Sequence, residues 1–257
     1  MFCRAWFRAL VIFFTFTFAC APCAFAQITP DYAREQRWAE EIVPGLVVGD
    51  AIQLETEAKR RFLAIHAPGK PGGGAVLLSH GSGVHPDFGV IGQLRTLLND
   101  AGYSTLSLQM PVLAAEATAN DYPAVFPEAG ERIAAGIAYL RNARHARIAL
   151  VTHSMGARMA REYLKRNPAT QLAVWVPLAI VDGDLAGLPK FGFPVLDIYA
   201  EKDFEVILAK TDERARALSA QPRSRQIMMP GADHFFTGRE RELDRLLRDA
   251  IAPLMRD

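Results

Sequence analysis

Residues 148–156 read Ile-Ala-Leu-Val-Thr-His-Ser-Met-Gly, and this stretch decides the fold. The apolar run 148–151 predicts a buried β-strand, and the residues after Gly156 predict a helix. Ser154 lies at the turn between them, where a strained backbone makes a hydroxyl project from the edge of a sheet. The pattern is typical of a nucleophile elbow, except that Thr152 replaces the usual first glycine. We expect the Cβ and methyl group of Thr152 to crowd the turn.

The N-terminal segment resembles a secretory signal peptide in its pattern. It has a basic start at Arg4 and Arg8, an apolar and threonine stretch over 9–19, and the small-residue cleavage site Ala-Phe-Ala over 24–26. The stretch is shorter than the roughly 20 apolar residues of a membrane span, which disfavours an uncleaved anchor. We therefore expect removal of residues 1–26, a periplasmic or secreted protein, and no stable membrane span after cleavage.

The three cysteines Cys3, Cys20 and Cys23 all lie in that segment. A lipid on Cys20 or Cys23 is an alternative, but Phe18 and Pro22 beside them fit it poorly. The mature chain then has no cysteine, which excludes disulfides, cysteine catalysis and thiolate metal sites. The oligomeric state is left open.

The remaining residues, 27–257, are enough for a single α/β domain with a large core. They carry 27 basic and 28 acidic residues, since the only charges in 1–26 are two arginines. Nothing in this balance favours a nucleic acid or an anionic membrane as a partner. A small molecule is the expected partner.

Short apolar runs alternate with helical stretches along most of the chain. The expected strands are 51–55, 60–66, 75–79, 104–108, 148–151, 172–176, 195–199 and 225–229. The expected helices are 30–41, 90–101, 128–141, 157–166, 205–218 and 239–254. This alternation predicts βαβ units and a parallel sheet covered on both faces. Ligands bind at the carboxyl ends of such strands, so the residues after each run are candidates for chemistry.

A serine nucleophile needs a base to accept its proton and a carboxylate to orient the base. His234 is the sole histidine after Ser154 and follows the last expected strand. Asp203 follows the preceding strand and is the favoured acid, with Glu201 as the weaker rival. Asp233, beside the base, is expected to shape its loop.

The negative charge on a tetrahedral intermediate needs backbone N–H donors. Met155, directly after the nucleophile, supplies one. The glycine-rich loop after strand 75–79 supplies the other, with Ser82 as first choice and Gly81 in reserve. His80 is expected to brace this loop and, with Gly81, to border the pocket.

Other residues have less specific interpretations. The segment from His85 to Phe88 either lines the pocket mouth or caps the next helix through Asp87. Tyr122, in the loop 111–127, is expected to help cover the pocket, and His153 to pack beside the elbow. Asp197 lies inside an expected strand, where a buried carboxylate needs local hydrogen bonds. No cluster has metal-ligand spacing, so no metal is expected.

Residues 80–83, 152–156, Asp203 and 231–234 together resemble the α/β-hydrolase superfamily. Residues 77–111 and 195–203 (VLDIYAEKD) also resemble a family of exported bacterial proteins known as DUF3530. The superfamily resemblance implies a mostly parallel eight-stranded sheet with helices on both faces, and no cofactor. It also implies that Ser154 is the nucleophile, His234 the base and Asp203 the acid. The short connection 177–194 leaves no room for a large lid domain.

These features predict an exported serine hydrolase that cleaves a carboxylic ester or related acyl bond of a small molecule. One alternative is a non-catalytic binding or scaffold protein on the same fold, because fold does not determine function. The retention of all three candidate residues favours catalysis over that alternative. Another is an acyltransferase that uses the same three residues, which the sequence does not separate from a hydrolase.

Overall fold

The computed structural model describes residues 28–181, 185 and 188–255, so the predicted signal peptide, 1–26, lies outside the described residues. The strands are β1 (Asp50–Glu55), β2 (Arg61–Ala67), β3 (Ala75–Ser79), β4 (Ser104–Leu108), β5 (Ile148–His153), β6 (Val174–Leu178), β7 (Leu196–Lys202) and β8 (Arg225–Asp233). The helices are α1 (Tyr32–Ile42), α2 (Gly89–Asp100), α3 (Phe126–Asn142), α4 (Met155–Arg166), α5 (Glu205–Leu208), α6 (Thr211–Ser219) and α7 (Glu240–Ile251).

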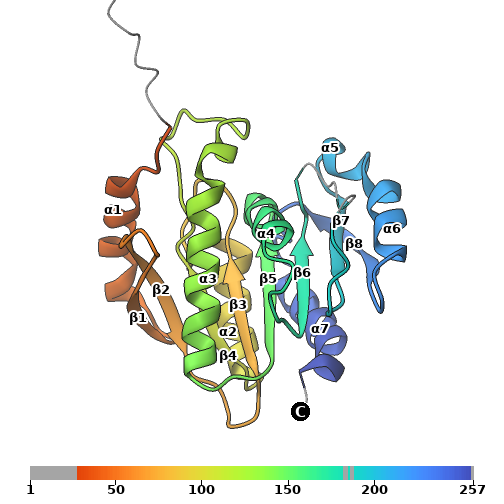
Figure 1. Cartoon of the computed structure of the whole chain (residues 1–257), viewed down its shortest axis with the longest axis horizontal. Coiled ribbons are helices and arrows are strands. Elements are labelled where there is room, and N and C mark those ends of the chain that lie inside the picture. Colours follow the sequence, from red (N-terminus) through yellow and green to blue (C-terminus); the bar gives the residue numbers. More distant parts are fainter. Residues whose placement is uncertain (1–27, 182–184, 186–187, 256–257) are drawn as a thin grey trace, which may run out of the picture.

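The described strands form one eight-stranded sheet with helices on both faces (Figure 1). Its order is β1-β2-β4-β3-β5-β6-β7-β8. The β1–β2 and β2–β4 pairs are antiparallel, and every later pair is parallel. The predicted mostly parallel sheet is therefore confirmed. Because β3, β5, β6, β7 and β8 run in the same direction, their carboxyl ends meet at one edge.

The sheet separates two apolar cores. In β5, Ile148 and Leu150 face the core under α3 and α4, whereas Ala149 and Val151 face the core under α2 and α7. Successive side chains of a strand point to opposite faces, so a central strand needs a continuous apolar run. This double burial explains why the runs at the centre of the sheet are readable from the sequence.

Several elements differ from their expected bounds. β5 extends two residues beyond 148–151, β6 lies two residues later than 172–176, and β7 and β8 continue beyond their apolar runs. The single helix expected over 205–218 is two helices, α5 and α6. Arg214 and Thr211 cause the break, because their side chains hydrogen-bond the carbonyl oxygens of Ile207 and Leu208 at the end of α5.

Asp197 has a structural role that the sequence leaves open. Its buried Oδ2 accepts hydrogen bonds from Arg214 Nε at 2.7 Å and from Gln226 Nε2 at 2.8 Å. These partners lie on α6 and β8, so one carboxylate of β7 holds two neighbouring elements. The pairing gives the buried carboxylate a counter-charge, while Asp197 Oδ1 has no hydrogen-bond partner among the described residues.

A second buried ion pair attaches α1 to the domain. Glu35 Oε2 lies 2.9 Å from Arg132 Nη1 on α3, and both side chains are buried. The same Nη1 donates to the carbonyl oxygen of Gln109 at 2.8 Å, and the N–H of Val112 donates to Glu35 Oε1 at 3.2 Å. The pair thereby fixes α1 and α3 to the segment that follows β4.

Replacing Glu35 with Ala should destabilise the fold, because it removes one of the two carboxylates that pair with the buried Arg132, leaving Glu128, and also removes the acceptor of the Val112 N–H. We expect the free energy of unfolding to fall by about 2 kcal/mol, measured by urea denaturation. The matched control is Glu213→Ala, which removes an exposed helical ion pair with Lys210 and should cost less than about 1 kcal/mol. Equal losses in the two variants would contradict a special role for the Glu35–Arg132 pair.

Candidate active site

Ser154 occupies a sharp turn between β5, which ends at His153, and α4, which begins at Met155. Its backbone has φ 55° and ψ −121°, a region that non-glycine residues rarely adopt. Such a conformation costs on the order of 1–3 kcal/mol and persists only where the surroundings impose it. The N–H of Ser154 donates to the carbonyl oxygen of Leu178 at 2.9 Å, which ties the turn to the neighbouring strand.

Thr152 and Gly156, two residues before and two residues after Ser154, have different environments. A Cβ on Gly156 would lie 2.7 Å from Ser79 Oγ and closer still to the carbonyl oxygen of His80, so only glycine fits there. Thr152 lies within β5, and its hydroxyl accepts a hydrogen bond from the indole of Trp175 at 3.1 Å. The hydroxyl of Thr152 is thus engaged with the neighbouring strand β6.

Three predicted residues form one hydrogen-bonded chain. Ser154 Oγ lies 3.0 Å from His234 Nε2, and His234 Nδ1 lies 2.7 Å from Asp203 Oδ1. A carboxylate only accepts hydrogen bonds, so Nδ1 carries the proton and Nε2 is left to accept the serine hydroxyl. All three side chains are buried. The backbone N–H of Phe204 donates to Asp203 Oδ1 at 2.8 Å and helps to orient the carboxylate.

The other carboxylates near these strand ends have different partners. Glu201 Oε2 accepts from the N–H of Gly231 at 2.7 Å. Asp233 Oδ1 accepts from the N–H groups of Phe235 and Thr237 at 3.1 and 2.9 Å. Glu201 thus holds the end of β8 against β7, and Asp233 shapes the loop of His234.

His153 braces His234 through the backbone. Its Nε2 donates to the carbonyl oxygen of His234 at 2.9 Å, and the two rings lie 5.2 Å apart. Burial lowers the pKa of His153 to about 4, so the ring is neutral at neutral pH. The two residues are 81 positions apart in the sequence, so no local motif predicts this hydrogen bond.

His80 orients the loop after β3. Its Nε2 accepts from the N–H of Met110 at 2.9 Å, which places the proton on Nδ1, and Nδ1 donates to the carbonyl oxygen of Gly81 at 2.8 Å. Burial lowers the pKa of His80 to about 3. A trans peptide directs its C=O and N–H to opposite sides, so fixing the Gly81 carbonyl also fixes the N–H of Ser82. Met155 N–H, at the first position of α4, is a donor that the helix itself leaves unused.

A cavity of about 700 Å³ opens over Ser154. Its lining includes the predicted residues His80, Gly81, Ser82 and Met155, together with Ser154 and His234. Phe88, from the segment 85–88 expected at the pocket mouth, also lines it, and so do Phe204 and Phe235, which the sequence reasoning misses. Phe204 directly follows Asp203, and Phe235 directly follows His234. Their places next to the candidate acid and base could have identified them as pocket residues from the sequence.

Two predicted pocket residues do not line this cavity. His85 packs against Trp38 and Phe88, with ring centroids 5.7 and 5.6 Å apart. Tyr122 is buried in the apolar core, where burial raises the pKa of its hydroxyl despite backbone hydrogen bonds from Leu113 and Gly83. The prediction that His85 and Tyr122 border the pocket is therefore wrong, because neither residue lines the cavity over Ser154.

The neighbouring segments also differ from expectation. Asp87 does not cap α2, because its carboxylate pairs with Arg95. Of the loop 111–127, only Ala119 lines the cavity. Arg34 on α1 holds this region from outside by donating to the carbonyl oxygens of Leu113 at 2.9 Å and Gly83 at 3.4 Å.

Comparison with known families is consistent with this geometry. A model described as "Protein of unknown function (DUF3530)" matches residues 21–130. The model of the dienelactone hydrolase family matches residues 114–251, more than half of the chain. The chain belongs to the dienelactone hydrolase family. The predicted membership of the α/β-hydrolase superfamily is thus confirmed, and the family supports assignment as a hydrolase. A comparison with curated proteins gives no match.

Several solved structures have the same fold as this chain. An α/β serine hydrolase homologue from Coxiella burnetii is 16% identical, with 79% of this chain and 97% of that one covered at a TM-score of 0.62. The dienelactone hydrolase from Anabaena variabilis is 18% identical, with 80% and 97% covered at a TM-score of 0.64. Est1E from Butyrivibrio proteoclasticus is 14% identical, with 80% and 99% covered at 0.61. At these identities the likeness shows the fold alone.

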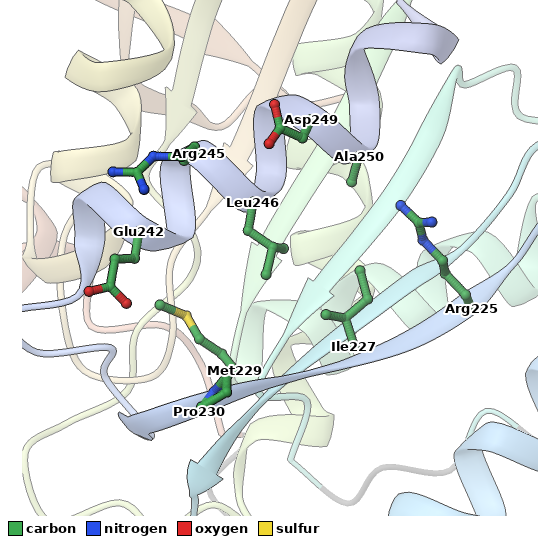
Figure 2. Close-up of a pocket in the computed structure, with 9 residues that line it drawn as sticks. All are labelled: Arg225, Ile227, Met229, Pro230, Glu242, Arg245, Leu246, Asp249 and Ala250. Atoms are coloured by element: carbon green, nitrogen blue, oxygen red, sulfur yellow. The ribbon is translucent and has the colours of Figure 1, made fainter.

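This family member has another hollow, of about 610 Å³, between β8 and α7 (Figure 2). Ile227, Met229 and Leu246 point into it, and charged side chains of both signs border it, among them Arg225 and Asp249. Its lining holds no serine, histidine or cysteine. This hollow therefore lacks the serine and histidine side chains that line the cavity over Ser154.

Two further observations concern the described part of the chain. No group of three or more His, Cys, Asp or Glu side chains there is arranged to hold a metal ion. No helix among residues 28–181, 185 and 188–255 has the length and apolar character to cross a bilayer.

Replacing Gly156 with Ala tests the fit of the elbow. The added Cβ would collide with the backbone of His80, and we expect the free energy of unfolding to fall by about 2 kcal/mol. Gly130→Ala, within α3, is the control. Its added Cβ would lie 3.5 Å from the ring of Tyr163 on α4, which is an ordinary van der Waals distance. That variant should be neutral or stabilising by up to about 1 kcal/mol. Thermal or urea unfolding measures both, and a stable Gly156→Ala protein would contradict the close packing.

Proposed function

We propose that this chain is a serine hydrolase that cleaves carboxylic esters through an acyl-enzyme intermediate. The carrying observation is the continuous hydrogen-bonded chain from Ser154 through His234 to Asp203 at the edge of a parallel sheet. Membership of the dienelactone hydrolase family supports the proposal. The order serine, acid, histidine is the order of this triad on α/β-hydrolase folds.

In the first half-reaction, Ser154 Oγ forms a bond to the acyl carbon while its proton moves to His234 Nε2. The resulting imidazolium is stabilised by the Asp203 carboxylate 2.7 Å from Nδ1. The N–H groups of Met155 and Ser82 are the proposed donors to the oxyanion. Removing one such donor typically lowers kcat by a factor on the order of 10²–10³, so these two N–H groups should contribute strongly to the rate.

In the second step, His234 Nε2 returns its proton to the oxygen of the leaving alcohol as the carbon–oxygen bond breaks. Water then attacks the acyl-enzyme, again losing its proton to Nε2, and the carboxylic acid is released with Ser154 restored. The cavity over Ser154 holds an ester of moderate size, because it measures about 700 Å³. No step in this scheme requires a cofactor.

The proposed nucleophile is tested with a fluorophosphonate probe. Wild-type protein should be labelled, and Ser154→Ala should lose labelling and fall by roughly 10⁴-fold or more in ester hydrolysis. Ser219→Ala is the matched control, because that hydroxyl only bonds the Arg216 carbonyl oxygen on α6. Folded wild-type protein that resists the probe would contradict the proposal.

We also propose that the protein is exported to the periplasm or beyond. The basic, apolar and small-residue segments of residues 1–26 support this. N-terminal sequencing of the protein from a periplasmic fraction should find Gln27 as the first residue. A full-length chain confined to the cytosol would count against export.

A further inference from the structure

The exposed phenylalanines of the described residues are concentrated at one place. They are Phe88, Phe204 and Phe235, with 50%, 48% and 54% of their surface exposed. All three line the cavity over Ser154. Exposed aromatic side chains are costly to leave in water, and a group of them around a cavity marks a binding surface. The cavity wall is therefore built to receive an apolar group.

Two of these rings surround the imidazole of His234. The Phe204 ring stacks on it with centroids 4.1 Å apart and planes at 24°. The Phe235 ring stands edge-on to it, with centroids 5.0 Å apart and planes at 85°. Phe204 and Phe235 are in turn perpendicular to each other at 6.1 Å. The imidazole occupies the inner side of this corner, and the exposed parts of the Phe204 and Phe235 rings are left to make aromatic contacts with a further ring.

The position of His234 decides which part of an ester meets this corner. Nε2 must come within hydrogen-bond reach of the leaving oxygen in order to protonate it. The alcohol group carried by that oxygen therefore passes beside the imidazole and against Phe204 and Phe235. Phe88 comes from a different segment of the lining, between β3 and α2, and has no ring contact with His234 among those of the described residues. We assign this part of the lining to the acyl group.

The charge of the cavity limits the alcohol further. Among the described lining residues, Glu240 is the one Asp or Glu, and none is Lys or Arg. An anionic alcohol group would find no cation to pair with and a carboxylate nearby. The lining therefore favours a neutral ester.

From this geometry we infer that the site is selective for neutral esters of aromatic alcohols. The inference rests on the proposed function and specifies its substrate class. The bond between the acyl carbon and the alcohol oxygen breaks, a proton passes from His234 Nε2 to that oxygen, and water supplies the oxygen and hydrogen of the acid. Phe204 and Phe235 determine specificity on the alcohol side, and Phe88 contacts the acyl side.

Benzyl butyrate and methyl butyrate test the inference, because their alcohols are of similar acidity and their acyl groups are identical. Wild-type kcat/KM should be about tenfold or more higher for the benzyl ester, as expected from burying an aromatic ring. The 4-carboxybenzyl ester should lose most of that advantage. A benzyl-to-methyl ratio near one would overturn the inference.

A pair of variants locates the selectivity. Phe235→Ala should lower the benzyl-to-methyl ratio about fivefold or more, whereas the equally exposed Phe88→Ala should leave the ratio within about twofold of wild type. Circular dichroism confirms that both are folded. Equal loss of the ratio in both variants, or none in Phe235→Ala, would overturn the assignment of the alcohol to this corner.

The outcomes separate this inference from the proposed function. If the fluorophosphonate probe labels Ser154 and the methyl ester is cleaved without preference for benzyl, only the aromatic selectivity fails. If the probe leaves the folded protein unlabelled and neither ester is cleaved, the proposed serine hydrolase fails with it.

Discussion

The site depends on one constraint, which is the tautomer of His234. Its Nε2 can accept a hydrogen bond from Ser154 only while the ring proton remains on Nδ1, and the Asp203 carboxylate at 2.7 Å keeps it there. Ser154, Asp203 and His234 follow three different strands. Their meeting therefore depends on the parallel register of β5, β6, β7 and β8, which aligns the carboxyl ends at one edge of the sheet.

Two buried neutral histidines hold the backbone beside this hydrogen-bonded chain. His153 holds the carbonyl oxygen of His234, and His80 holds the carbonyl oxygen of Gly81. Burial depresses the pKa of each far below neutrality, so neither adds positive charge beside the site. An imidazole suits the task because it is a rigid ring with one donor and one acceptor. The same residue type thus serves as support at two positions and as proposed base at the third.

Much of this was predictable because a parallel sheet leaves a readable pattern. The central strands are buried on both faces, so their apolar runs stand out, and the strand ends indicate Ser154, Asp203 and His234. The contacts that were missed cross long stretches of sequence, such as His153 with His234 and Asp197 with Arg214 and Gln226. The wrong expectations for His85 and Tyr122 share a cause: residue type and position along the chain do not determine which way a side chain points.

The attachment of α1 has a consequence for the order in which the chain folds. α1 has 11 residues, and an isolated helix of that length is marginal in water. Its main anchor, Arg132, lies 97 positions further along the chain. Contacts of such separation require closure of a long loop and form slowly. The segment that is synthesised first among the described elements therefore waits for α3, and Arg34 secures Gly83 beside the site only after that late docking.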